Sequence, residues 1–160
     1  MSEVPILKDT VRTNGREALQ KNIQAAMALS EAIRSTLGPK GLDKLLIDDD
    51  GRTLVTNDGV TVLETAKVEH PVAKMLINAS STQDRIAKDG TTSTVILAGE
   101  MLQNAWQLIL QGIHPSTIAR GYRKSEQYIL ECLSEILIDS SDEIRKRVVK
   151  TSLAGKGHNS

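Results

Sequence analysis

The chain has 160 residues, which suits a single domain large enough to bury a core. Its hydrophobic content of 39% includes no phenylalanine and one tryptophan, so we expect an aliphatic core of packed helices. Twenty basic and twenty acidic residues cancel and aromatic residues make up 2%, which argues against a nucleic-acid partner. The single cysteine excludes an intramolecular disulfide. With no apolar run of membrane length and no signal peptide, we expect a cytoplasmic protein without a membrane partner.

The first 13 residues lack periodicity and predict an extended arm. Asn14, with Glu17 three residues later, has the spacing of a capping box, and the apolar residues that follow recur at steps of three and four as far as Leu37. This pattern predicts a long amphipathic helix. It ends in a turn at residues 37–41, where two glycines and Lys40 form a loop that could hold an anion.

Two short apolar runs, at residues 44–47 and 53–56, predict a β-hairpin. The aspartates at its tip are consecutive, whereas a calcium loop of the EF-hand type needs ligands at alternating positions, so we assign them to a solvated turn. The second strand leads into a turn at residues 56–59. There, Asp58 either bonds the backbone of the turn or supplies a carboxylate to a ligand.

The rest of the chain predicts helices. A short one is expected over 60–66, and longer ones are marked by apolar spacing over 72–86, 95–109 and 118–136. Ser140 and Glu143 repeat the capping-box spacing before a last helix, and a loop is expected from Thr151 to Gly157.

The segment Lys88–Thr94 joins two of these helices and is rich in hydroxyl-bearing residues. The first turn of a helix has free N–H groups and the positive end of the helix dipole, so it favours phosphate. Asp89 beside a phosphate requires a bridging cation such as Mg²⁺. The segment therefore indicates a metal-bound nucleotide, unless Asp89 is only a helix N-cap.

Other common chemistries do not fit the sequence. No stretch has the span of a Walker A motif, so we exclude a P-loop fold. Cys132 lies beside the apolar stripe of its helix without a histidine partner, and the three histidines do not have the spacing of a metal site.

Five motifs occur along the chain, in the order Leu37-Gly38-Pro39-Lys40-Gly41, Thr56-Asn57-Asp58-Gly59, Glu69-His70-Pro71, Asp89-Gly90-Thr91-Thr92 and Ile113-His114-Pro115. Together they resemble the N-terminal part of a group II chaperonin subunit, and the opening Val4-Pro5-Ile6-Leu7-Lys8 is most similar to the archaeal thermosome. The resemblance covers essentially the whole chain. It implies a mainly α, multihelical equatorial domain with a small β-hairpin, of which this chain is the N-terminal half.

The resemblance also implies a site for ATP or ADP with Mg²⁺. Asp89 is expected to coordinate the metal and Asp58 to position the attacking water as the catalytic residue. Lys156 is expected in a loop that senses the terminal phosphate. The remaining expected nucleotide contacts are Leu37, Gly38, Pro39, Gly59, Gly90, Thr91, Thr92 and Ser93.

The family resemblance implies further expectations for organisation and partners. Residues 1–13 form an arm, 14–148 the ATP-binding half-domain, and 149–160 the start of the nucleotide-sensing loop. The partners are other chaperonin subunits in a double ring, contacted through the hairpin and the arm. Unfolded client proteins are expected to bind to domains beyond these 160 residues. A second catalytic carboxylate is expected from a later segment of the subunit. If these residues were the whole molecule, apolar helix faces would be exposed and the chain would tend to associate.

Lys88 departs from the family pattern, which favours glycine directly before the Asp-Gly-Thr-Thr core. The lysine could add a phosphate contact or block the approach of backbone to the phosphates. Lys88 therefore leaves a second hypothesis open, a degenerate or truncated assembly subunit that does not hydrolyse ATP. A third hypothesis, an unrelated four-helix interaction module, applies only if the motifs are coincidental.

Overall fold

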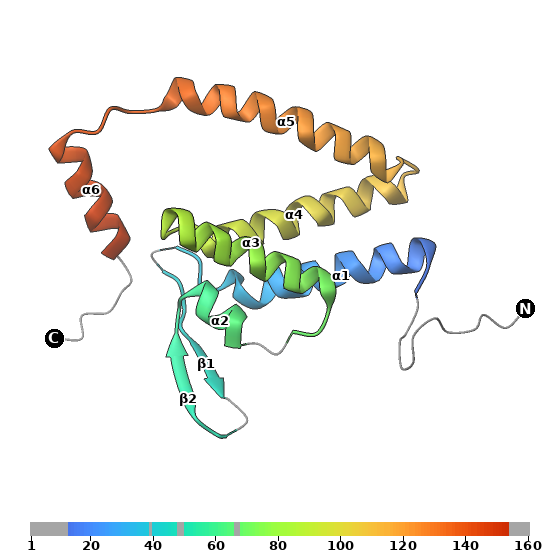
Figure 1. Ribbon diagram of the computed structural model, residues 1–160, viewed down its shortest axis with the longest axis horizontal. Coiled ribbons are helices and arrows are strands. Elements are labelled where there is room, and N and C mark those ends of the chain that lie inside the picture. The colour runs from blue at the N-terminus through green and yellow to red at the C-terminus, as the bar shows by residue number, and fades with distance from the viewer. Residues whose placement is uncertain (1–12, 39, 48–49, 66–67, 154–160) are drawn as a thin grey trace, which may run out of the picture.

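The structure is a computed structural model that describes residues 13–38, 40–47, 50–65 and 68–153. Most of the predicted arm, together with the predicted nucleotide contacts Pro39 and Lys156, lies outside these ranges. The described elements are, in order, α1 (Gly15–Arg34), β1 (Lys44–Ile47), β2 (Thr53–Thr56), α2 (Gly59–Thr65), α3 (Pro71–Ala87), α4 (Thr91–Leu110), α5 (Pro115–Ile136) and α6 (Asp142–Leu153). The predicted mainly α, multihelical fold with one small hairpin is confirmed (Figure 1).

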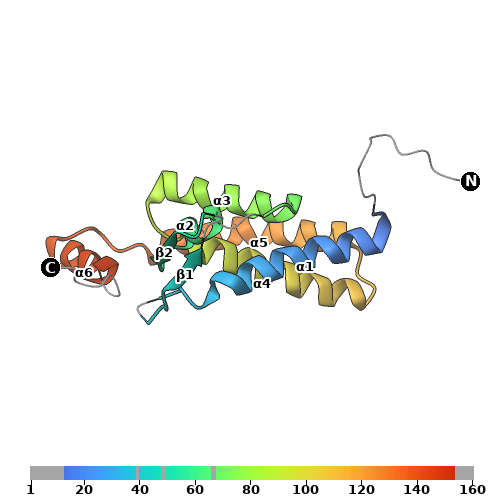
Figure 2. The ribbon, with the colours of Figure 1, turned by 90° about the horizontal axis from the view of Figure 1, so that it is seen from below.

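Helices α1 and α4 form the central pair of the fold and make its most extensive helix contact. They run antiparallel (Figures 1 and 2). The Arg16 guanidinium at the start of α1 therefore lies over the ring of Trp106 near the end of α4, 5.9 Å from its centroid. Midway, Ser30 faces Gly99, where a Cβ atom added to the glycine would come within 2.5 Å of the Ser30 Cβ atom. The absence of a side chain at residue 99 therefore sets how closely the two helices approach.

The hydrophobic core is aliphatic, as the composition predicts. Its main cluster of buried residues comes from four helices and contains Leu29, Ile33, Val62, Leu63, Ala73, Val95 and Ile96. Helix α3 packs along α4, and the short helix α2 closes one end of the core against both. The end of α1, the end of α3 and the start of α4 lie at this same end of the bundle (Figure 1).

Two helices begin at a histidine followed by a proline, in two of the motifs that carry the family resemblance. The Nδ1 atoms of His70 and His114 accept hydrogen bonds, both of 3.3 Å, from the backbone N–H groups of Val72 and Ser116. Proline at the first helical position needs no hydrogen-bond partner for its nitrogen. The His-Pro pairs therefore start α3 and α5.

Neither predicted capping box forms. Asn14 is the N-cap residue of α1, but its side chain makes no capping bond, and Glu17 instead pairs with Lys21 at 2.7 Å. At α6 the hydroxyl of Ser141, not Ser140, accepts from the backbone N–H of Ile144. The glutamates prefer lysine or arginine partners one turn along the same helix, because such charged pairs align at this spacing.

The hairpin is antiparallel and pairs Lys44 with Thr56 and Ile47 with Thr53. Leu46 packs against the core, whereas Leu45 and Val55 are exposed. The hairpin projects away from the helices (Figure 1) and presents apolar side chains to solvent.

Helix α5 contacts α4 only near its start, where Ile118 is buried and the Tyr122 hydroxyl donates to the Met101 carbonyl at 2.6 Å. Farther along, its apolar residues are exposed, and no residue of α6 is buried. Helix α6 continues to Leu153, so the prediction of a loop from Thr151 is wrong for its first three residues. None of the described helices has both the length and the apolar composition needed to cross a membrane.

Lys88 is the C-cap residue of α3, has φ 57° and is the only described non-glycine residue with positive φ. Its backbone N–H donates to the Asp84 carbonyl at 2.9 Å, and its Nζ atom lies 3.3 Å from an Asp84 carboxylate oxygen. The side chain thus lies back along α3, while the backbone is in the left-handed region that favours glycine.

The contact between Ser30 and Gly99 predicts opposite effects of alanine at two helical glycines. Gly99→Ala should lower the free energy of unfolding by about 1–2 kcal/mol, because the new methyl group overlaps Ser30. Gly121→Ala on α5 is the matched control and should raise it by about 0.5–1 kcal/mol, because a Cβ atom there meets nothing within 4 Å. Urea unfolding followed by circular dichroism measures both. Equal stabilisation by the two substitutions would contradict the close approach of α1 and α4.

The left-handed backbone at Lys88 predicts that glycine is preferred over alanine at this position. Both Lys88→Gly and Lys88→Ala remove the exposed pair with Asp84, so their difference reports the backbone alone. We expect the glycine variant to be more stable by about 1 kcal/mol in thermal unfolding. An alanine variant as stable as the glycine variant would show that residue 88 is not left-handed in solution.

Candidate functional site

The candidate site is built on the turn between α3 and α4. Gly90 is the N-cap residue of α4 with φ 79°, and no side chain makes a capping bond to the first turn. Thr91 and Thr92 are buried in that turn, and Ser93 is exposed. The first backbone N–H groups of α4 have no carbonyl partners within their own helix, so they are available to an anion.

Asp89 precedes the N-cap residue and does not cap the helix. The alternative that Asp89 is only a helix N-cap is therefore excluded. Its Oδ1 atom accepts from the backbone N–H of the next residue, Gly90, at 2.7 Å. The carboxylate is thus held at the mouth of the turn, next to the first turn of α4, and it is exposed to solvent.

Two residues of α3 support this turn, and sequence reasoning missed both. The Nε2 atom of Gln83 donates to the backbone carbonyl of Asp89 at 3.0 Å, and the buried Ser80 hydroxyl donates to the Thr91 carbonyl at 3.2 Å. In the sequence they are only polar residues in the last two or three turns of a predicted helix. Such residues are common on helix surfaces, so they do not indicate a site.

The predicted residues Asp58 and Gly59 lie beside the same turn. A Cβ atom on Gly59 would come within 2.2 Å of the Thr92 Oγ1 atom, so the start of α2 packs directly on the first turn of α4. The Asp58 Oδ2 atom accepts from the backbone N–H and the hydroxyl of Thr61, at 2.9 and 2.7 Å. Asp58 therefore caps α2, which matches its predicted role in the turn.

The predicted loop at residues 37–41 begins directly after α1. The Gly41 backbone N–H donates to the Gly38 carbonyl at 2.9 Å, and Leu37 is exposed. Ile33 in the last turn of α1 and Val95 in α4 share the core cluster, so this loop starts at the end of the bundle that carries the turn at 88–90. Among the described residues, the structure thus gathers the predicted contacts at one end of the bundle.

The residues present suit a phosphate group bridged to a divalent cation. Backbone amides without a side-chain cap favour the anion, and the carboxylate of Asp89 offers a hard oxygen ligand. Within the described ranges no three acidic, histidine or cysteine side chains form a metal cluster. This composition fits Mg²⁺ better than Ca²⁺, because Mg²⁺ is commonly held by one or two carboxylates, substrate phosphates and water.

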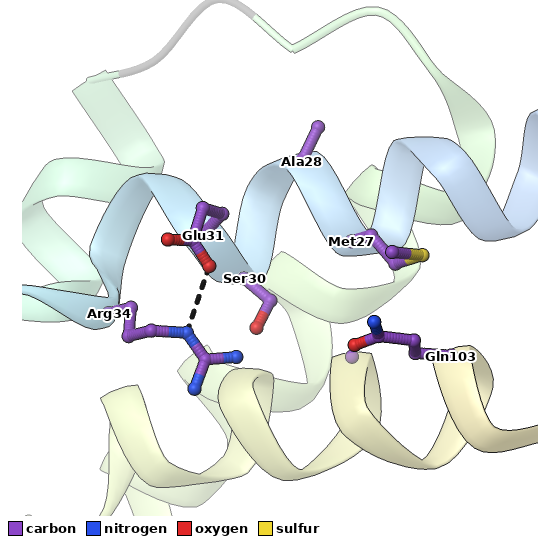
Figure 3. Close-up of a pocket in the computed structure, with 7 residues that line it drawn as sticks. Met27, Ala28, Ser30, Glu31, Arg34 and Gln103 are labelled. Carbon is purple, nitrogen blue, oxygen red and sulfur yellow. Dashed lines mark hydrogen bonds and ion pairs between the residues drawn. The ribbon is translucent and has the colours of Figure 1, made fainter.

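A cavity of about 270 Å³ lies elsewhere, between α1 and α4, and none of the predicted site residues lines it. Arg34, Ser30 and Gln103 are among its lining residues (Figure 3). Glu100 and then Glu31, both hydrogen-bonded to the guanidinium of Arg34, raise the pKa of that side chain. Because two carboxylates already compensate this charge, the cavity is a poorer candidate for an anion than the turn at 88–90.

The sequence and the fold both have clear relatives. The model of the TCP-1/cpn60 chaperonin family matches residues 29–160. Thermosome subunit beta of Archaeoglobus fulgidus is 52% identical over 158 residues, which is 96% of this chain and 29% of the relative. Thermosome subunit alpha of Thermoplasma acidophilum is 43% identical over 158 residues, with the same two coverages.

A solved structure described as a group III chaperonin in the open state matches with a TM-score of 0.74 and 36% identity. The match covers 79% of this chain and 26% of that one. The chain spans about 29% of the length of its curated thermosome relatives. The predicted resemblance to archaeal thermosome subunits is confirmed, and the hypothesis of an unrelated four-helix module is excluded. This chain belongs to the TCP-1/cpn60 chaperonin family.

Proposed function

We propose that this chain is the N-terminal half of a chaperonin equatorial domain and that it binds ATP or ADP with Mg²⁺ at the turn between α3 and α4. The observation that carries this proposal is the start of α4. Its glycine N-cap leaves the first-turn amides without a side-chain cap, and Asp89 holds a carboxylate directly beside them. The first-turn amides of Thr91–Ser93 would hold the phosphates, because the Gly90 N–H is already bonded to Asp89 Oδ1, and the Asp89 carboxylate would hold the cation.

The other predicted contacts complete this site. Leu37 and Gly38 contact the nucleotide from the end of α1, and Gly59 allows the start of α2 to approach the first turn of α4. Asp58 positions the attacking water. Its Oδ2 atom accepts two hydrogen bonds from Thr61, so we assign that water to Oδ1. The bound Mg²⁺ supplies charge neutralisation at the phosphates, which is the part of phosphoryl transfer that backbone amides alone do not provide.

The chain covers less than a third of its curated relatives, so the remaining activities are proposed for the longer subunit. That subunit assembles with other chaperonin subunits into a double ring in the cytoplasm and couples ATP hydrolysis to the folding of client proteins. The exposed apolar hairpin is the surface proposed for contact with a neighbouring subunit, because unpaired strand edges favour association.

Removing the Asp89 carboxylate should abolish the effect of Mg²⁺ on nucleotide binding. We expect Asp89→Ala to weaken Mg-ADP binding about tenfold or more, since a ligand to the cation is lost, and to leave binding in EDTA nearly unchanged. Isothermal titration calorimetry with ADP, in Mg²⁺ and in EDTA, measures both affinities.

Asp139→Ala is the matched control, because Asp139 is an exposed carboxylate outside the helices. It should bind Mg-ADP as the unaltered chain does. If the unaltered chain bound ADP no more tightly in Mg²⁺ than in EDTA, or if Asp89→Ala did not change that difference, the proposed metal site would be wrong.

The packing of α2 on α4 predicts a coupled effect of two substitutions. Gly59→Ala should weaken Mg-ADP binding and lower stability by about 1–3 kcal/mol, because its methyl group overlaps the Thr92 hydroxyl. Adding Thr92→Ala removes that oxygen and should restore part of the stability. A double-mutant cycle from urea unfolding measures the coupling, and strictly additive effects would contradict the contact.

A further inference from the structure

Gln83 holds the backbone of Asp89 from the last turns of α3. Its Nε2 atom donates to the Asp89 carbonyl at 3.0 Å, and the same nitrogen lies 3.4 Å from the position that a Cβ atom on Gly90 would occupy. The side chain is half-buried, so it lies alongside the turn and does not extend into solvent. The side chain of Gln83 thus bonds Asp89 and lies close to Gly90.

The position of Asp89 between two helices explains why its carbonyl takes a side-chain partner. Residues on either side of it, Lys88 and Gly90, have φ 57° and 79°, so the chain reverses direction around a single residue. The backbone N–H of Lys88 belongs to the hydrogen-bond pattern of α3, and the Gly90 carbonyl accepts from Thr94 in α4. The carbonyl of Asp89 takes part in the backbone hydrogen bonds of neither helix, and the side chain of Gln83 donates to it.

The two bonds of Asp89 together fix the direction of its side chain. Gln83 holds the carbonyl, and the backbone N–H of Gly90 holds the Oδ1 atom of the carboxylate. A carboxylate restrained on both sides loses less conformational freedom when it binds a cation than one on a mobile turn. Residues that orient a metal ligand without touching the metal commonly have a strong effect on metal affinity.

We propose that Gln83 is a positioning residue for the magnesium-nucleotide site, acting through the backbone of Asp89. This inference rests on the proposed function of the turn. Gln83 touches neither the cation nor the phosphates in this account. Its contribution is to the affinity for the metal-bound nucleotide, and the affinity for nucleotide without metal is independent of it.

Gln83→Met tests the inference, because methionine keeps the length of the side chain and removes the N–H donor. We expect Mg-ADP affinity to fall roughly tenfold and ADP affinity in EDTA to stay within about twofold, both measured by titration calorimetry on the 160-residue chain. Gln127→Met is the matched control, since Gln127 is exposed on α5, and it should bind as the unaltered chain does. Gln83→Asn, whose amide falls one carbon short, provides a milder second variant with the same expected selectivity.

The outcomes separate this inference from the function on which it rests. If the unaltered chain shows no Mg²⁺-dependent binding, or Asp89→Ala does not reduce it, the proposed function fails first. If both hold but the two Gln83 variants keep the unaltered Mg-ADP affinity, the inference about Gln83 is wrong. It is also wrong if they weaken binding equally with and without Mg²⁺, because that result would show a general structural role.

Discussion

The reversal of the chain between α3 and α4 is the constraint on which the candidate site depends. Only three residues, 88–90, separate the two helices, and two of them have left-handed backbone. This short connection keeps α3 packed along α4. It also places Asp89 at the mouth of the first turn of α4, where its carboxylate bonds the N-cap residue. A longer or more flexible connection would separate the carboxylate from the amides.

Small residues hold the surrounding elements close to α4. Gly99 allows α1 to approach, Gly59 allows α2 to approach, and the buried Ser80 of α3 bonds the carbonyl of Thr91. Each contact fixes one neighbour of the same helix. Close-packed interiors transmit displacements because they leave few voids, so a shift of α2 or α3 alters the first turn of α4, and a shift of α1 alters its middle. The site is therefore determined by packing around α4 as much as by its own sequence.

The sequence predicted much of the fold because apolar spacing and glycine or proline signals coincide at most helix ends. Leu102 and Ala105 follow helical spacing on α4, and Pro71 and Pro115 stand at the first positions of their helices. Helix starts were less predictable. The spacing of Asn14 and Glu17 indicated a capping box, but Lys21 offers the glutamate an opposite charge one turn away.

For the candidate site, sequence reasoning found the residues that a motif contains and missed those that support them. Gly90 and Asp89 belong to a recognisable segment, whereas Gln83 acts through one contact with a backbone carbonyl. Such a contact depends on the path of the backbone in the turn. Sequence spacing does not reveal it, because a glutamine on a helix surface follows no distinctive pattern. The left-handed backbone of Lys88 was also hidden, since lysine is an uncommon residue in that conformation.

The most direct test of the central claim is a crystal structure of this chain with ADP and Mg²⁺. We predict phosphate oxygens about 2.9 Å from the backbone nitrogens of the first turn of α4, and Mg²⁺ about 2.1 Å from an oxygen of Asp89. Phosphates bound elsewhere, for example in the cavity beside Arg34, or a cation without contact to Asp89, would contradict it.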